Sequence, residues 1–390
     1  MPFFDYDPSD AQAPSVMRQR QLYQEIFNFP GRYDFPAEST VEAVQRGLNF
    51  ILQLVHDPAN FADFGSDAML FFSDLATVAR EPLRKFVFPR VGLLAQRWKQ
   101  RYQKLADVLQ GSRVEATDVV DAVVGVYALE RVGATHPLKM ETKKFIQGSN
   151  YSSHDYFGGF DPRSQCPSVL EPAISRHRVL THAMTTALYA ERVGLELGAT
   201  QEEVLAHLPK VRPYLESPNQ CELGGKDWVD QITLVINIIH IASNFGELRV
   251  SPSLVPEESK VVMAEETLDT ALKGRDVHLI GHLCHCMRIL GVEGDNPRLR
   301  KGISFLVNQQ LLDGSWVGRE NADDPYTRYH AAMCAVVCLH SPEFRGFGPI
   351  NPSLAELLGK TGSPTDGNSN ALKMCSCGIE VVPLQKPNNW

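Results

Sequence analysis

Apolar residues recur at helical spacing along most of the chain. From Ser39 a Ser-Thr-x-Glu start is followed by Val41, Val44, Leu48 and Ile51, a pattern that predicts a capped amphipathic helix. No alternation of period two extends beyond about four residues. The pattern therefore predicts an all-α fold. Further helices are expected over 68–78, 83–109, 117–131, 176–197, 202–208, 227–245, 265–272, 276–290 and 329–339.

The two ends of the chain differ from this helical middle. Residues 1–37 are rich in Pro, Asp and aromatic side chains, with one short helical pattern around 17–27, and predict an extension that wraps the outside of the domain. Residues 346–390 are rich in Pro, Gly, Ser and Asn and include Cys375 and Cys377, which predicts a loop-rich tail. The interval 38–345 is the expected helical domain of this 390-residue chain.

One hairpin, between Lys301 and His330, carries a recognisable spacing. An amphipathic helix ends at a Gly-bearing turn with one Trp, and a second helix follows a polar loop. The residues that carry the spacing are Lys301-Gly302, Phe305-Leu306, Gln310, Gly314 and Trp316. This spacing resembles the repeat of squalene and oxidosqualene cyclases, and so the α/α toroid superfamily, which includes the β subunits of protein prenyltransferases. The resemblance implies a toroid (barrel) of helical hairpins.

The motif also has a physical interpretation. Gln310 near a helix end can offer its amide to the backbone of a neighbouring helix, and Trp316 just past the turn can stack beneath it. Both interactions would join adjacent hairpins, so the motif is structural. The alternative is an ordinary helical hairpin with an Asp-Gly turn.

Composition and charge narrow the class of protein. The hydrophobic fraction of 43% and charged fraction of 22% are those of an ordinary globular protein. A net charge of −8, without a basic run, argues against a nucleic-acid partner. No stretch has the apolar length of a membrane span, and the acidic start does not resemble a signal peptide. We expect a cytoplasmic protein whose eight cysteines are reduced thiols.

Polar residues form a stripe on the predicted helix over 227–245. Thr233, Asn237, His240 and Asn244 follow one another at steps of 4, 3 and 4, and apolar residues cover the other faces. In a toroid such a stripe would face the central cavity, which makes Asn237 and Asn244 candidate catalytic residues. The alternative is a structural hydrogen-bond seam between helices.

Histidines also lie on single faces of other predicted helices. His278, His282 and His285 share a helix face, and so do His330, Cys334 and Cys338. A further helix with many small residues presents His182. Imidazoles suit zinc, iron or copper. We expect one inward histidine from each of four helices to form a divalent metal site, with Zn or Fe as the metal. These predicted ligands are His182, His240, His282 and His330.

The helix of His330 resembles the Tyr-His-x-x-x-Cys helix that supplies a zinc ligand in prenyltransferase β subunits. The turn Leu312-Asp313-Gly314-Ser315 resembles their ligand turn, although Ser315 stands where the thiolate would be, so their zinc chemistry is not carried over. Asp313 is kept as a candidate catalytic residue. A long loop is expected over 145–169, lying over the cavity mouth with Tyr156, Phe157 and Phe160 as candidate substrate contacts.

Three functions are compatible with these patterns. The first is an enzyme whose central cavity holds a His-ligated metal and a small, largely apolar substrate. The second is a metal-free terpene cyclase or prenyl-transfer relative that stabilises carbocations with aromatic faces. Neither an Asp-x-Asp-Asp nor an Asp-Asp-x-x-Asp motif is present, which disfavours standard terpene cyclisation. The third is a non-catalytic helical scaffold or binding protein. Substrate, reaction type and oligomeric state are left open.

Overall fold

The computed structural model describes residues 37–111, 114–163, 175–212, 214, 226–317, 324–349 and 352–359. The described chain is predominantly helical, which confirms the all-α prediction, and its strands are one short parallel pair. The helices and strands are α2 (Ala37–His56), α3 (Pro58–Val78), α4 (Leu83–Gly111), α5 (Ala116–Arg131), α6 (Leu138–Gly148), α7 (Ser153–Tyr156), α8 (Arg176–Arg192), α9 (Gln201–Leu205), η2 (Leu208–Lys210), α10 (Lys226–Ala242), β1 (Arg249–Val250), η3 (Pro252–Leu254), α11 (Pro256–Met263), α12 (Glu265–Lys273), α13 (Val277–Ile289), α14 (Pro297–Gln309), α15 (Pro325–Leu339), β2 (Phe347–Gly348) and α16 (Pro352–Gly359).

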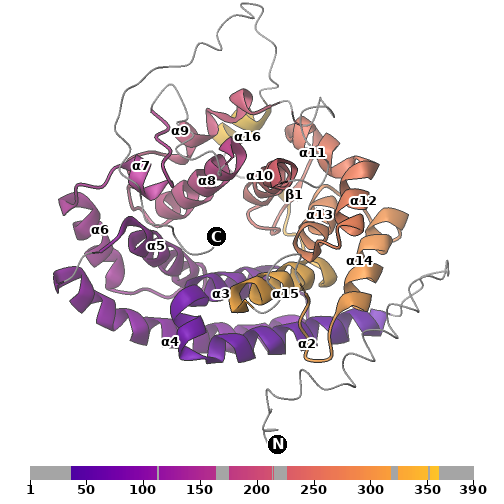
Figure 1. Cartoon of the computed structure of the whole chain (residues 1–390), viewed down its shortest axis with the longest axis horizontal. Helices are drawn as coiled ribbons and strands as arrows, with labels where there is room; N and C mark the ends of the chain where they lie inside the picture. Colours follow the sequence, from indigo (N-terminus) through magenta and orange to yellow (C-terminus); the bar gives the residue numbers. More distant parts are fainter. Residues whose placement is uncertain are drawn as a thin grey trace, which may run out of the picture.

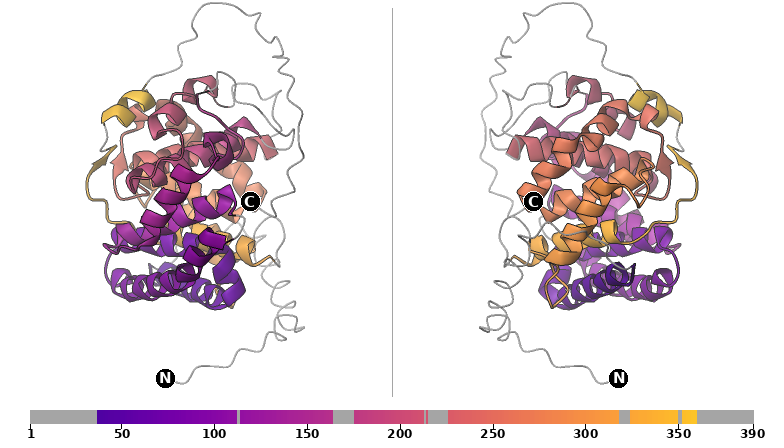
Figure 2. Two further views of the ribbon diagram at one scale, coloured as in Figure 1. Left: turned by 90° about the vertical axis from the view of Figure 1, so that its left-hand side faces the viewer. Right: turned by 90° about the vertical axis from the view of Figure 1, so that its right-hand side faces the viewer.

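Six helices of the described chain pack against one another in a closed order. α3 contacts α5, α5 contacts α8, α8 contacts α10, α10 contacts α13, α13 contacts α15, and α15 contacts α3. Figure 1 shows these six helices around the middle of the molecule, with α4, α6, α11, α12 and α14 farther out. The first and last parts of the described domain meet, because α2 packs against α15 (Figures 1 and 2).

Side-chain caps fix where the helices near the middle begin. The carboxylate of Asp276 accepts the backbone N–H of Leu279 at the start of α13, and that of Asp324 accepts the N–H of Thr327 at the start of α15. Such caps satisfy backbone donors that would otherwise lack a partner. They therefore define the positions of the histidines that follow on both helices.

The Gln-Gly-Trp corner, which we define as Gln310, Gly314 and Trp316, joins α14 to α2. The side-chain amide of Gln310 donates to the carbonyl oxygens of Ala43 at 2.8 Å and Gly314 at 3.1 Å. Its amide oxygen accepts two bonds from the Arg46 guanidinium, at 2.7 and 3.1 Å. The predicted bond from Gln310 to the backbone of a neighbouring helix is thus confirmed.

The other two residues of the corner explain its close fit. The Trp316 indole is fully buried and donates to the Leu306 carbonyl at 2.7 Å. A Cβ at Gly47 of α2 would lie 2.8 Å from the indole ring, and one at Gly314 only 2.4 Å from the Arg46 carbonyl oxygen. Gly314 also has a φ of +88°, which favours glycine. The corner therefore fastens the end of the helical domain to its first helix.

Some predicted boundaries are wrong. α3 begins at Pro58 rather than at residue 68, because Asp57 caps it, with a kink at Phe64. α6 extends to Gly148 and α7 begins at Ser153, so helices occupy parts of the predicted 145–169 loop. α11 was not predicted, since its eight residues are too few to establish a periodic pattern. The predictions for residues 1–36 and 360–390 lie outside the described residues, and the domain boundaries stay predictions.

Candidate metal centre

The polar stripe of α10 faces the middle of the molecule. α10 packs against α8 and α13 on its two sides and against α11 outside, which leaves one face for the interior. Thr233, Asn237 and His240 are partly exposed there, whereas the other residues over 231–239 are buried. The Asn237 amide donates to the Thr233 carbonyl at 2.8 Å. The predicted place of Asn244 on the stripe is wrong, because α10 ends at Ala242 and Asn244 has a φ of +51°; its amide donates to the Glu247 carboxylate at 2.5 Å. Their predicted catalytic roles stay predictions.

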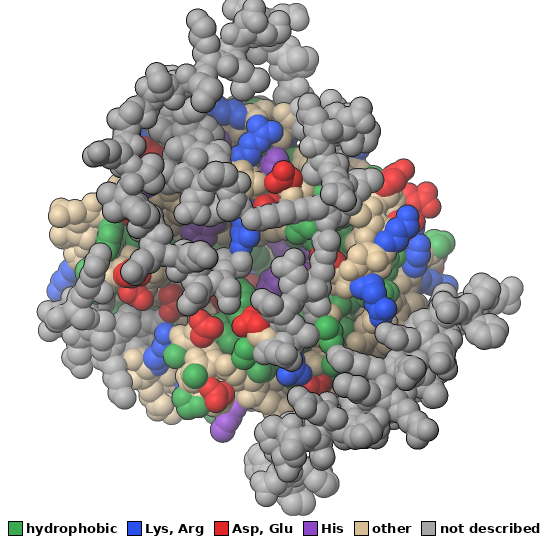
Figure 3. All heavy atoms as spheres, in the orientation of Figure 1, with side chains coloured by type: hydrophobic (Ala, Val, Ile, Leu, Met, Phe, Trp, Pro, Cys, Tyr) green, Lys and Arg blue, Asp and Glu red, His purple; other side chains and the backbone are tan. Residues whose placement is uncertain are grey.

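Six of the twelve histidines form one continuous group, here called the histidine cluster. Ring centroids of successive members are 4.6, 6.2, 5.1, 5.4 and 6.1 Å apart. Figure 3 shows histidine side chains, in purple, near the middle of this face of the molecule. The histidine cluster consists, in spatial order, of His278, His330, His282, His240, His285 and His340.

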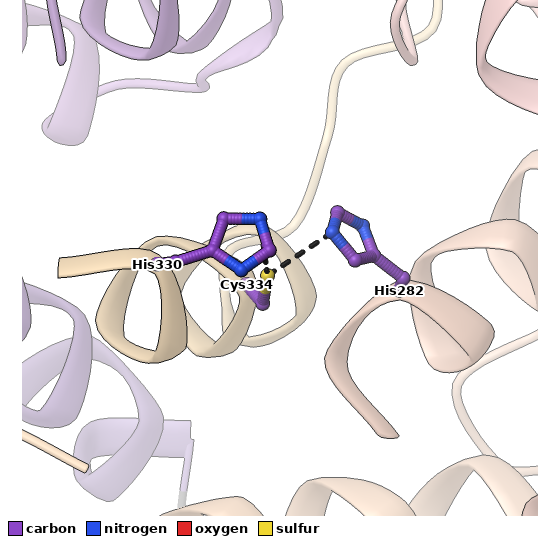
Figure 4. Close-up of side chains that lie close together, drawn as sticks. All are labelled: His282, His330 and Cys334. Atoms are coloured by element: carbon purple, nitrogen blue, oxygen red, sulfur yellow. Dashed lines mark hydrogen bonds between the residues drawn. The ribbon is translucent and has the colours of Figure 1, made fainter. Parts of the chain in front are cut away.

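Three donor atoms within this region converge. The Sγ of Cys334 lies 3.0 Å from Nε2 of His282 and 4.0 Å from Nε2 of His330. One ligand atom from each residue lies within 4.8 Å of the other two, the arrangement that can hold a metal ion. Figure 4 shows His330 and Cys334 on one helix and His282 reaching toward them from the facing helix. We call this group of three the candidate metal centre.

Close helix packing makes this convergence geometrically feasible. α13 and α15 form an extensive contact, and a Cβ added at Gly281 would lie 2.4 Å from the Cys334 carbonyl oxygen. Only a glycine fits at that distance. Because Gly281 directly precedes His282, the close approach of the two backbones brings the imidazole to the thiol.

Burial keeps the candidate ligands neutral. Burial lowers the pKa of His330 to about 3 and that of His240 to about 4, and it lowers the pKa of His282 well below its usual value. Neutral imidazole is the form that binds metals. Burial also raises the pKa of the Cys334 thiol, so a metal would have to displace a proton from sulfur on binding.

The histidine cluster also contains many unsatisfied atoms. Among the described residues, it includes five buried ring nitrogens without a hydrogen-bond partner. Each such atom costs about 1–3 kcal/mol of folding free energy. None of the five is a nitrogen that faces Cys334, so a metal at the candidate metal centre would leave these five atoms to other partners. The five atoms are His240 Nε2, His278 Nε2, His282 Nδ1, His285 Nδ1 and His340 Nδ1.

A carboxyl group is linked to the candidate metal centre through Tyr326. Asp67 of α3 is partly exposed and hydrogen-bonds the Tyr326 hydroxyl, and the Tyr326 ring stacks on His330 at 6.0 Å. Burial, with the nearby charges of Asp121 and Asp63, raises the pKa of Asp67 to about 7. A carboxyl with that pKa can hold or release a proton near neutral pH.

Sequence reasoning missed Asp67 and Tyr326, and it did not select Cys334 as a ligand. The spacing of Cys334, one turn after His330, was a usable signal. The sequence around Asp67 contained no such signal, because its partner Tyr326 lies far along the chain and the two meet only through tertiary packing.

Three of the four predicted metal ligands, His240, His282 and His330, lie together in the histidine cluster. His182 does not belong to it. Its side chain hydrogen-bonds the backbone of Tyr156 and lies beside Gly158. Metal binding by any of the four stays a prediction.

The remaining candidates lie elsewhere. Asp313 accepts a bond from the Ser315 hydroxyl at 2.7 Å and pairs with Arg328 at 2.7 Å, which orders the turn. The side chains of Tyr156, Phe157 and Phe160 are buried in the hydrophobic core. Their catalytic and substrate-binding roles stay predictions.

No family model matches the chain, and neither the curated proteins nor the solved structures include a significant match. Within the described part of the chain, no helix combines the length and apolar character needed to cross a membrane.

Proposed function

We propose that this protein is a metal-dependent enzyme built as an α/α toroid, with the metal held by His282, His330 and Cys334. The observation that carries the proposal is the convergence of two imidazole nitrogens and one thiol within 4.8 Å of one another. Burial lowers the pKa of both histidines and so keeps their imidazoles neutral, which is the form that binds a metal.

Two features support the toroid. The six helices around the middle contact one another in a closed order, and the Gln-Gly-Trp corner fastens the last part of this ring to α2. This is the role that the resemblance to the toroid superfamily gives the motif. The candidate metal centre then lies on the inner faces of α13 and α15.

The donor set favours zinc. Two imidazoles and one thiolate are common zinc ligands, and three protein ligands leave one coordination position for water or substrate. A metal in such a site acts as a Lewis acid and lowers the pKa of bound water. Asp67 would hold or accept the proton, and Tyr326 would fix the position of Asp67 relative to His330. We therefore favour hydrolytic or hydration chemistry.

The inner faces favour a polar substrate rather than the largely apolar one expected from the sequence. Thr185, Thr233 and Asn237 are partly exposed on α8 and α10, and Asp67 is partly exposed on α3. Met333 and Val337 on α15 supply a smaller apolar surface. A small molecule with hydroxyl, amide or amine groups fits these walls better than a hydrocarbon.

Metal analysis of the tag-free protein tests the proposal. After zinc loading and dialysis, we expect close to one zinc per chain in the native protein and a large loss in Cys334→Ala and in His330→Ala. His56→Ala is the matched control, because His56 is exposed on the end of α2 and should leave the zinc content unchanged. Native protein without zinc, or an equal content in all variants, would overturn the proposal.

A further inference from the structure

His240 lies next to the candidate metal centre without belonging to it. Its ring centroid is 5.1 Å from that of His282, yet its nitrogens are outside the convergent group of three. It comes from a third helix, α10, and projects from the polar stripe.

The orientation of His282 leaves one of its nitrogens in need of a partner. Nε2 faces the Cys334 sulfur at 3.0 Å, so Nδ1 is the nitrogen that would remain protonated when Nε2 binds a metal. Nδ1 is buried and has no hydrogen-bond partner, and the same is true of Nε2 of His240. A metal-bound histidine almost always donates its other N–H to an acceptor.

The ring separation fits such a bond. Two imidazoles joined by an N–H···N bond of about 2.9 Å have centroids about 5 Å apart, because each nitrogen lies about 1 Å from its ring centre. The observed 5.1 Å agrees. A half-turn of the His240 ring exchanges its nitrogen and carbon positions within the same outline and leaves Nε2 of His282 on Cys334, so the bond requires no movement of the helices.

We infer that His240 is a positioning residue that accepts a hydrogen bond from Nδ1 of His282 and thereby fixes the orientation of that ligand on the metal. This inference rests on the proposed metal centre. His240 would in turn donate a hydrogen bond from its own ring N–H to the next ring, His285, whose centroid is 5.4 Å away. His282, His240 and His285 would then form one hydrogen-bonded chain that begins at the ligand His282.

Cobalt(II) affinity of the purified full-length protein tests the inference, with three variants compared with the native chain. His240→Leu removes the acceptor and keeps an apolar side chain, and we expect affinity to fall about 10- to 100-fold at unchanged stoichiometry. His240→Gln supplies an amide oxygen as acceptor and should recover most of this loss. His177→Leu is the matched control, because His177 also has a buried Nε2 without a hydrogen-bond partner but lies outside the histidine cluster.

The outcomes separate the two proposals. Native protein that binds cobalt together with unchanged affinity in His240→Leu would overturn the positioning role and leave the metal centre standing. A loss of stoichiometric binding in His240→Leu that Gln does not rescue would also overturn it, because His240 would then be a ligand. Native protein that binds no cobalt would overturn the metal centre, and the inference with it.

Discussion

The Gln-Gly-Trp corner and the histidine cluster differ in whether their polar side-chain atoms have hydrogen-bond partners. At the corner, both ends of the Gln310 amide and the Trp316 indole N–H have partners. In the histidine cluster, five buried ring nitrogens have none within the described chain. Unpaired buried groups cost folding free energy, so the corner stabilises the fold while the cluster weakens it.

This difference helps to distinguish side chains that stabilise the fold from side chains that bind a ligand. A satisfied polar group is explained by the stability it supports. Three donor atoms that lie within 4.8 Å of one another need another explanation, and the metal centre is the one we propose. Substitutions at the corner should therefore change stability, whereas substitutions in the cluster should change binding.

The largest expected effect is that of Trp316→Ala. The indole is fully buried against Gly47 and bonded to Leu306, so its removal should lower the free energy of unfolding by about 3–5 kcal/mol. Chemical denaturation measures this value. Leu312→Ala is the control, because Leu312 is 72% exposed in the same turn and its removal should have little effect. A small loss in Trp316→Ala would show that the corner does not fasten the domain.

The next effect is stabilisation by metal. Zinc at about 100 times its dissociation constant should raise the free energy of unfolding of the native protein by about 2.7 kcal/mol. In His282→Ala this rise should disappear, because the ion loses one of its three protein ligands. Thermal unfolding with zinc and with a chelator checks both. An equal rise in the variant would contradict the assignment of His282.

Gln310→Leu should cost less, about 1–2 kcal/mol, because it leaves the Ala43 and Gly314 carbonyls without the amide donor. Arg46→Ala isolates the other half of the interaction. Its partly exposed guanidinium contributes little, so we expect a loss below about 0.5 kcal/mol. Similar losses in the two variants would contradict the importance of the amide bond to α2.

The smallest expected effect is on the pH dependence of stability without metal. The folded protein lowers the pKa of His240 to about 4 from 6.5, so below pH 6.5 the unfolded chain binds a proton that the folded chain does not. Stability should therefore fall as pH falls. Between about pH 6.5 and 5.5 the fall should be about 1 kcal/mol smaller in His240→Ala than in the native protein. Stability curves of the native protein and of His240→Ala that run parallel over this pH range would contradict the lowered pKa of His240.

Local patterns predicted much of the fold. The stripe of Thr233, Asn237 and His240 follows from the helical period alone, and Gln310 reached the backbone of a neighbouring helix as its motif indicated. The start of α3 was missed because its kink at Phe64 interrupts the period.

The candidate site was less accessible to sequence reasoning, because it depends on how two helices are placed relative to each other. His282 and Cys334 are 52 residues apart and meet through the close approach at Gly281, which no local pattern encodes. His182 has the same sequence character as His240, yet it turns toward the backbone of Tyr156. Tertiary packing alone distinguishes the two.

The most direct test of the metal centre is the absorption spectrum of the cobalt-substituted protein. Cobalt bound by His282, His330 and Cys334 should give the intense near-ultraviolet charge-transfer band of a thiolate ligand together with visible bands of a four-coordinate site. Cys334→Ala should lose the charge-transfer band. Cys286→Ala removes a different buried thiol, which lies on α13, and should keep the band. A native spectrum without the thiolate band, or a band that survives in Cys334→Ala, would contradict the proposed centre.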